Sequence, residues 1–406
     1  MSDDVRDYLA KDFFGREAVE HYLDPDYAPM WARFDPELGY VLRGVMLKQG
    51  LDKCYSIENY EEGGQRRVIQ YRDQPCRINT YGDSFTQCAQ VSDGETWQEY
   101  LAAHLGEPIR NFGVGGYGFY QAYRRAVRVE ATELSAPYIV LNIYHDDHTR
   151  SLDASMRVRK MSPNDADPLL FAGTPWVHVR YDLEGGRFVE RPSLCPTPDA
   201  LRELCDPRRV YEAFKDDPIV RLKVLQLGGR VQDVEDLQAL AEVFDVDADL
   251  ADPARSADDA YALHMAYALR STEFVLDLAR ESIASTGKKL LVLLSYGHAV
   301  LPHALQGEPR FDQSLIDYLQ RNNVPYVDGL QRHIDDFKVY RLSPAEYIDR
   351  YYIGHYSPSG NHFFAFAVKD AFVDWLDPTP LAYQPGAEGL TEEAARLACT
   401  SGRSAG

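Results

Sequence analysis

The sequence lacks long apolar runs, an excess of basic charge and closely paired cysteines, and each shortage excludes a class of protein. Its longest apolar stretches, such as 137–144 and 290–296, fall far short of the ~20 residues that a membrane-spanning helix needs. The chain has 43 Lys and Arg against 63 Asp and Glu, so its formal net charge is −20. Because nucleic acids and anionic membranes bind basic surfaces, we expect neither as the main partner.

Cysteine is also scarce, and its spacing predicts neither a disulfide framework nor a zinc site. The six cysteines form no CxxC pair and have no Cys/His zinc spacing. They are Cys54, Cys76, Cys88, Cys195, Cys205 and Cys399. The acidic N-terminus lacks the basic and apolar segments of a signal peptide. We therefore expect a cytoplasmic protein with reduced cysteines, no metal and no cofactor.

What the chain does contain is the residue balance of a soluble globular protein, with 45% apolar and 26% charged residues. Strand and helix patterns alternate along it. Strands are expected at 76–81, 109–112, 137–144, 289–296 and 325–327. Helices are expected at 96–105, 118–134, 258–286, 311–322 and 357–376. This alternation predicts a three-layer α/β/α fold with a mostly parallel, flavodoxin-like sheet, interrupted by a large insertion.

The domain organisation follows from where this alternation stops and resumes. We interpret 75–150 and 257–376 as two halves of one α/β domain, and 151–256 as an insertion or cap over the carboxyl edge of the sheet. Residues 1–74 form an N-terminal extension in this interpretation. The tail at 377–406 is rich in Pro, Gly and Ala and is expected to be loose. The insertion leaves the ligand edge of the sheet, so we expect it to shape a pocket over Ser84.

The first candidate motif is Gly82-Asp83-Ser84-Phe85-Thr86, directly after the first expected strand. A serine at this strand-to-helix turn has its hydroxyl at the sheet edge where open α/β folds bind ligands. A simple turn and helix cap is the alternative, because Gly, Asp and Ser are common turn residues.

The second motif is the glycine-rich GVGGYG at 113–118, after the second expected strand. Its glycines let backbone N–H groups approach a ligand closely. The motif also matches the GxGxxG dinucleotide fingerprint, but the acids about 20 residues on precede the next strand instead of ending it.

Two histidine-containing segments complete the set. The first is His145-Asp146-Asp147-His148, which follows the third expected strand; its ligands would splay on an extended chain, so we prefer a polar strand end to a metal site. The second, GHYSPSGNH at 354–362, feeds the last helix and brings His355 to the same sheet edge as Ser84.

Taken together, GDSFT, NFGVGGYG and the late GHYSPSGNHFFA resemble the SGNH, or GDSL-type, hydrolase superfamily. The resemblance covers 76–150 and 288–376 and is closest to large members related to polysaccharide O-acetyl esterases and acetyltransferases. It implies that Ser84 is the nucleophile and His355 the general base. It also implies an oxyanion hole made by the N–H groups of Ser84 and Gly116 and by a side chain after the third strand.

This sequence departs from the family pattern at two positions. The oxyanion asparagine is replaced by the pair Asp146-Asp147, so Asn142 or His145 is the candidate substitute. The acid expected two or three residues before His355 is also missing. Asp349, six residues back, is our choice to orient the imidazole, with Asp328 as its competitor and a Ser–His dyad as the alternative.

The function that this constellation predicts is a serine esterase or deacylase. It would hydrolyse an O-acyl ester, acetyl by preference, on a carbohydrate or small metabolite through an acyl-enzyme on Ser84. Asp83, Tyr117, Asp146 and Asp147 adjoin the motifs and are expected to contact substrate. An O-acyltransferase and a catalytically degenerate carbohydrate- or partner-binding protein remain open alternatives. The oligomeric state is not indicated.

Overall fold

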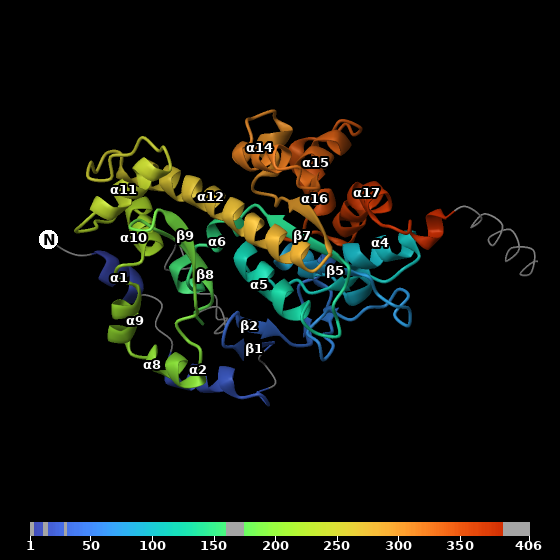
Figure 1. The fold of residues 1–406 in the computed structure, drawn as a ribbon, viewed down its shortest axis with the longest axis horizontal. Coiled ribbons are helices and arrows are strands. Elements are labelled where there is room, and N and C mark those ends of the chain that lie inside the picture. The colour runs from blue at the N-terminus through green and yellow to red at the C-terminus, as the bar shows by residue number, and fades with distance from the viewer. Residues whose placement is uncertain (1–3, 11–14, 28–30, 160–173, 385–406) are drawn as a thin grey trace, which may run out of the picture.

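A five-stranded parallel sheet forms the centre of the computed structural model, which describes residues 4–10, 15–27, 31–159 and 174–384 (Figure 1). Its strands are β5 (Ile78–Tyr81), β6 (Arg110–Asn111), β7 (Tyr138–Tyr144), β10 (Lys289–Ser295) and β11 (Tyr326–Asp328). Their order in the sheet is β6-β5-β7-β10-β11, and all neighbours are parallel. In chain order this is 2-1-3-4-5, the flavodoxin-like arrangement, so the predicted α/β class is confirmed.

Burial explains why these apolar runs become central strands. All seven residues of β7 are buried, and so are the last five of β10. The two strands pair along their full length, from Lys289 opposite Tyr138 to Ser295 opposite Tyr144. Strands covered on both faces read as continuous apolar runs rather than as alternating ones.

Helices cover both faces of the sheet. The connection from β5 to β6 crosses the sheet in one direction, and the connection from β6 to β7 crosses it in the other. Right-handed crossovers therefore place the helices before and after β6 on opposite faces of the sheet. One layer holds α5 (Phe119–Val129), α12 (Ser256–Ser285) and α14 (Gln313–Arg321). The other holds α4 (Trp97–Leu105), α15 (Gly329–Phe337) and α17 (Pro358–Trp375). Trp97 and Phe364 join α4 to α17 with ring centroids 5.6 Å apart. The short helices α13 (Leu301–Leu305) and α16 (Pro344–Tyr351) pack against this second layer.

The N-terminal segment is divided between two parts of the molecule. Its helices α1 (Asp4–Ala10) and α2 (Arg16–Leu23) pack against helices of the insertion. It continues in two antiparallel hairpins, β1 (Ala32–Asp35) with β2 (Gly39–Leu42), and β3 (Val45–Leu47) with β4 (Ser56–Glu58). These hairpins lie beside the sheet domain (Figure 1).

The insertion forms a largely helical lobe at the end of the molecule opposite α4 and α17 (Figure 1). It starts with α7 (Met156–Arg159) and an antiparallel hairpin of β8 (His178–Asp182) and β9 (Arg187–Arg191). Four helices follow: α8 (Pro198–Glu203), α9 (Pro207–Phe214), α10 (Pro218–Gln226) and α11 (Glu235–Val243). The 30-residue α12 then runs from this lobe back along the sheet.

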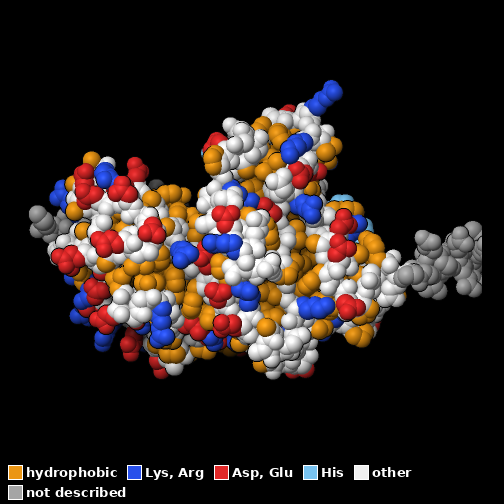
Figure 2. Space-filling model, turned by 45° about the horizontal axis from the view of Figure 1, so that its top comes forward, with side chains coloured by type: hydrophobic (Ala, Val, Ile, Leu, Met, Phe, Trp, Pro, Cys, Tyr) orange, Lys and Arg blue, Asp and Glu red, His pale blue; other side chains and the backbone are white. Residues whose placement is uncertain are grey.

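One sequence expectation is wrong, and another falls outside the described residues. The segment after β7 is not extended, because Asp147–Arg150 forms the short helix α6. The tail beyond residue 384 lies outside the described residues. Among the described helices, none is long and apolar enough to cross a bilayer. Acidic and basic side chains are interspersed on the face shown in Figure 2.

Candidate active site

The sheet topology itself indicates where a ligand binds. In open α/β sheets the ligand site lies outside the carboxyl ends of the strands, at the point where the strand order reverses. Here that point is between β5 and β7. Ser84 starts the short helix α3 (Ser84–Gln87) three residues after β5 ends, and its helix is capped by Asp83, whose carboxylate accepts from the Phe85 N–H at 2.8 Å. The GDS serine is therefore placed at the switch point.

His355, from the C-terminal part of the chain, contacts Ser84. Its Nε2 lies 2.8 Å from the Ser84 Oγ. His355 is in a tight turn between α16 and α17, in which the Ile353 N–H donates to the His355 carbonyl at 2.8 Å. Ser357 caps α17 through the Gly360 N–H, and Pro358 occupies its first turn. These local devices hold the turn that carries the imidazole.

Gln90, a residue that the sequence analysis missed, occupies the position expected of an acid. Its Oε1 lies 2.9 Å from the Nδ1 of His355 and also accepts from the His355 backbone N–H at 2.8 Å. Its Nε2 donates to the Gln49 carbonyl at 3.2 Å. Both ends of the amide are therefore assigned by their partners.

The tautomer of His355 follows from this arrangement. Gln90 Oε1 only accepts hydrogen bonds, so Nδ1 must carry the proton. Nε2 is then unprotonated and presents its lone pair to the Ser84 hydroxyl. This is the protonation state that a general base requires.

The aspartates expected to orient His355 lie elsewhere. Asp349 is exposed near the end of α16, and His355 Nδ1 contacts Gln90 instead. Asp328 caps α15 and forms an ion pair with Arg310 at 2.6 Å. The prediction of Asp349 is wrong, and its competitor Asp328 does not take the role either. The amide oxygen of Gln90 accepts the same hydrogen bond as a carboxylate would, and a search for acidic residues does not find it.

The loop that carries Gln90 is held in an unusual conformation. Cys88 and Gln90 both have left-handed backbones, with φ of 60° and 73°. Arg66 is 1% exposed and donates to the carbonyls of Gln87 at 2.6 Å and Cys88 at 2.8 Å. It also pairs with Asp93 at 3.1 Å. The buried Arg66 guanidinium therefore donates hydrogen bonds to backbone carbonyls that the left-handed turn leaves without partners of its own.

Two backbone donors beside Ser84 are available to a ligand. Among the described residues, neither the Ser84 nor the Gly116 N–H has an intramolecular acceptor. The neighbouring Gly115 N–H, in contrast, donates to Gln87 Oε1 at 2.6 Å. Free backbone donors such as these, one at the start of α3 and one in the glycine-rich loop, can stabilise an oxyanion.

The two side chains expected to complete this group are engaged in other contacts. Asn142 is fully buried and donates to Thr86 Oγ1 at 3.0 Å. His145 accepts from the Gly297 N–H at 3.1 Å and contacts Asp146 at 3.2 Å. Burial lowers the pKa of His145 to about 4. Neither prediction holds, because the Asn142 amide nitrogen and both ring nitrogens of His145 already have partners within the protein.

Three of the expected substrate contacts form an ion cluster beneath Ser84. Arg150 lies 3.1 Å from Asp83, 3.3 Å from Asp147 and 3.0 Å from Asp146. Asp83 and Asp147 are fully buried, and burial raises the pKa of each carboxyl while Arg150 opposes the rise. These two acids therefore serve the structure rather than substrate; only Asp146 is half exposed.

Tyr117 is likewise unavailable to substrate. It is fully buried, and its hydroxyl donates to the Tyr40 carbonyl.

Among the described residues, no group of three or more His, Cys, Asp or Glu is arranged to hold a metal ion. His148, the second histidine of the segment after β7, contacts Thr272 at 2.9 Å.

The environment of His355 favours the neutral imidazole. Burial is the largest cause that lowers the pKa of His355 to about 4, and the positive charge of Arg150 adds to it. The neutral form is the one that accepts a proton, so the site is ready for base chemistry at neutral pH. Ser84 Oγ also lies 3.3 Å from Asp83 Oδ2, a longer contact than that to His355.

The start of the insertion reaches this edge. Arg159 of α7 donates to the Gly116 carbonyl at 2.9 Å and pairs with Asp153 at 2.8 Å.

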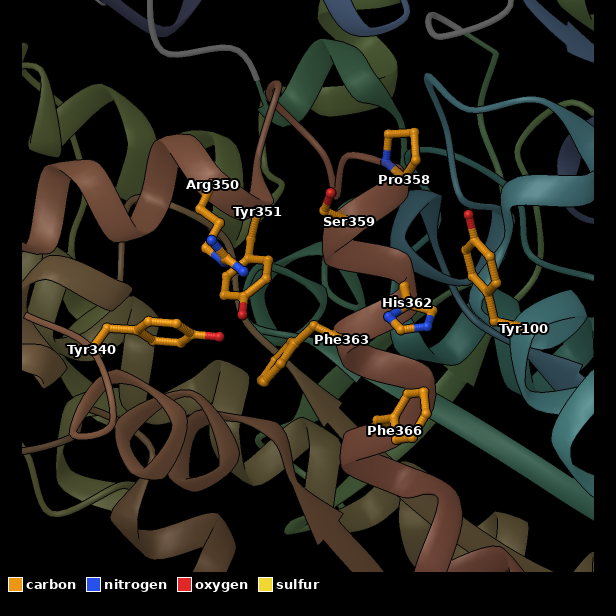
Figure 3. A pocket seen from close by; sticks show the side chains of 9 residues that line it. All are labelled: Tyr100, Tyr340, Arg350, Tyr351, Pro358, Ser359, His362, Phe363 and Phe366. Atoms are coloured by element: carbon orange, nitrogen blue, oxygen red, sulfur yellow. The ribbon is translucent and has the colours of Figure 1, made fainter. Parts of the chain in front are cut away.

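A separate hollow of about 530 Å³ lies on the outer side of α17 (Figure 3). Aromatic rings of Tyr100, Tyr340, Tyr351, Phe363 and Phe366 line it, and Ser84, Gln90 and His355 do not.

Comparisons with known proteins give little beyond this geometry. No protein-family model matches the chain, and no curated protein matches its sequence. One similar solved structure is a member of the lipolytic protein G-D-S-L family from Veillonella parvula DSM 2008. It is 13% identical, with a TM-score of 0.33, and the match covers 73% of this chain and 98% of that one. A likeness this weak carries no argument about fold or function.

Proposed function

We propose that this protein is a serine hydrolase that cleaves an ester through an acyl-enzyme on Ser84. The observation that carries the proposal is the continuous line from Ser84 Oγ to His355 Nε2 at 2.8 Å and from His355 Nδ1 to Gln90 Oε1 at 2.9 Å. A nucleophile, a base and an orienting group in hydrogen-bond contact form the arrangement that activates a hydroxyl. This line favours catalysis over a binding-only protein.

The chemistry takes two steps. Ser84 Oγ bonds to the acyl carbon while its proton moves to His355 Nε2, and the carbonyl oxygen becomes an oxyanion facing the Ser84 and Gly116 N–H groups. His355 then gives the proton to the departing alkoxide, which leaves the acyl group on Ser84. In the second step His355 takes a proton from water, and the hydroxide attacks the acyl carbon. The bond between that carbon and Ser84 Oγ then breaks, the carboxylic acid leaves, and His355 returns the proton to Ser84 Oγ.

The substrate we propose is an O-acyl ester, acetyl by preference, of a carbohydrate or a small hydroxylated metabolite. Support comes from the sequence resemblance to SGNH hydrolases related to polysaccharide O-acetyl esterases, with which the five-stranded parallel sheet is consistent. In this mechanism Gln90 orients His355 without adding a negative charge.

A fluorophosphonate probe tests the proposal directly. We expect it to label Ser84 alone, as identified by peptide mass mapping. The Ser84→Ala variant should lose labelling and at least about 10³-fold in the rate of aryl acetate hydrolysis, since the nucleophile is removed. Ser359→Ala, which alters an exposed serine at the start of α17, should behave as the wild type. Unchanged hydrolysis by a folded Ser84→Ala protein would refute the mechanism.

A further inference from the structure

The peptide bond between Gly115 and Gly116 carries one of the two free N–H donors of the site. Its other polar end, the Gly115 carbonyl, accepts a hydrogen bond from the Tyr40 hydroxyl at 2.6 Å. A peptide unit is planar and trans, so its C=O and N–H point in opposite directions. A contact that fixes the carbonyl therefore also fixes the direction of the Gly116 N–H.

Tyr40 is itself held firmly. It lies in β2 and is fully buried. Its ring packs edge-on against Tyr117 and Trp176, with centroids 5.3 Å and 6.1 Å away. Its backbone carbonyl accepts from the Tyr117 hydroxyl. The hydroxyl of Tyr40 is thus presented to the glycine loop from a rigid support.

Gly116 is shaped to admit this contact. Its φ is +82°, a left-handed conformation that favours glycine. A Cβ at this position would lie 2.7 Å from the Tyr40 hydroxyl. Close approach of the tyrosine and the left-handed turn therefore both require the absence of a side chain at Gly116.

The N–H group of Gly115 is also held, indirectly, by the N-terminal segment. The Gly115 N–H donates to Gln87 Oε1 at 2.6 Å, and Gln87 Nε2 donates to Glu58 Oε2 at 2.7 Å. Glu58 is buried in β4. Tyr40 acts on the loop directly, and Glu58 acts through Gln87.

We propose that Tyr40 is a positioning residue of the oxyanion hole: its hydrogen bond to the Gly115 carbonyl aims and polarises the Gly116 N–H. This inference rests on the proposed ester hydrolysis. A hydrogen bond to the carbonyl of an amide strengthens its N–H as a donor. Negative charge on the substrate oxygen develops only in the transition state. We therefore expect loss of the Tyr40 hydrogen bond to lower kcat and to leave KM unchanged.

The variant Tyr40→Phe tests this proposal, with Tyr22→Phe as its matched control. Tyr22 donates through a buried hydroxyl to the Gly39 carbonyl at 3.0 Å, so the control removes a similar hydrogen bond one residue away without touching the glycine loop. For Tyr40→Phe we expect kcat on an aryl acetate to fall about tenfold or more, below the ~10²–10³ cost of deleting a donor outright, with KM within twofold. Tyr22→Phe should keep kcat within twofold.

Two further measurements separate positioning from loss of fold. Rates are expressed per active site titrated to completion with fluorophosphonate, so unfolded protein does not contribute. Inhibition by phenylboronic acid, which forms a tetrahedral anion on a serine, should weaken in Tyr40→Phe by about the factor that kcat loses.

The outcomes are distinct. Equal kcat for Tyr40→Phe and the wild type, equal losses in both tyrosine variants, or a kcat loss with unchanged boronate affinity would each overturn the role of Tyr40 while leaving ester hydrolysis in place. A wild-type protein that neither hydrolyses esters nor labels at Ser84 would overturn the proposed function, and this inference with it.

Discussion

At the scale of single residues, the most informative contact is the one between Gln90 and His355. An amide oxygen fixes the tautomer of the imidazole as a carboxylate does, but it brings no negative charge to stabilise the imidazolium form. With the burial of His355 and the nearby charge of Arg150, this keeps the pKa of His355 low, at about 4. The base is therefore neutral over the whole physiological range.

The pH profile tests this account. The active form of His355 is the neutral one, so kcat/KM should be flat above about pH 5 and fall at lower pH with an apparent pKa near 4. Gln90→Glu places a carboxylate beside Nδ1, favours the charged imidazole and should move the acid limb upward by about 1–3 pH units. Gln90→Ala should instead lower kcat by about 10²–10⁴-fold, because the ring loses its orienting partner.

Two results would count against this role. One is an acid limb that stays in place in Gln90→Glu, and the other is a Gln90→Ala variant with more than a third of the wild-type kcat. Asp349→Asn serves as the control, because this exposed side chain should leave both the rate and the profile unchanged.

At the scale of elements, the loop between α3 and η2 (Asp93–Glu95) depends on one buried arginine. Arg66 comes from the N-terminal segment and supplies hydrogen bonds to Gln87, Cys88 and Asp93 at once. Its removal would leave the Asp93 carboxylate, 7% exposed, without its cationic partner. Loss of one member of a buried ion pair costs far more than loss of a surface pair.

Arg66→Met should therefore lower the free energy of unfolding by about 3–5 kcal/mol, measured by urea denaturation. Because the same loop carries Gln90, kcat should fall in the folded fraction too. Arg67→Met is the matched control: this neighbour is exposed, and its replacement should change stability by no more than about 0.5 kcal/mol. A cost below about 1 kcal/mol for Arg66→Met would show that the loop holds itself.

The elements also show what could be predicted from the sequence. The strand expected at 137–144 is β7, Tyr138–Tyr144, and the helix expected to start at Ser357-Pro358 is α17. Apolar runs and cap residues are local signals, so they locate such elements within a few residues. The segments that carry Ser84 and His355 were found for the same reason.

The remainder of the site depends on contacts between distant segments. Gln90 reaches His355, 265 positions later, only through a left-handed backbone held by Arg66. Gly354, with φ of +109°, leaves room for it, since a Cβ there would lie 2.8 Å from Gln90 Oε1. A glycine directly before the histidine was the one sequence signal that a side chain packs closely there, and it names no partner.

At the scale of the whole molecule, the N-terminal segment is part of the site rather than an appendage. Residues 39–67 contribute Tyr40 to Gly115, Glu58 to Gln87, the Gln49 carbonyl to Gln90, and Arg66 to the Gln90 loop. They thus support both the Gly115–Gly116 peptide, which carries one candidate oxyanion donor, and the orienting group Gln90. The polypeptide between this segment and β5 is, in contrast, exposed over residues 69–75.

This difference leads to a prediction for a chain cut between the two. A specific protease site placed between Tyr71 and Gln74 should be cleaved in the folded protein, since these residues are exposed. The N-terminal fragment should then co-elute with the remainder in size-exclusion chromatography, because Tyr40, Arg66 and Glu58 are buried against the sheet domain. Ester hydrolysis and Ser84 labelling should persist after cleavage, and should be lost together when mild urea releases the fragment. A fragment that separates while labelling continues would show that the sheet domain organises its own site, and the supporting role of residues 39–67 would be wrong.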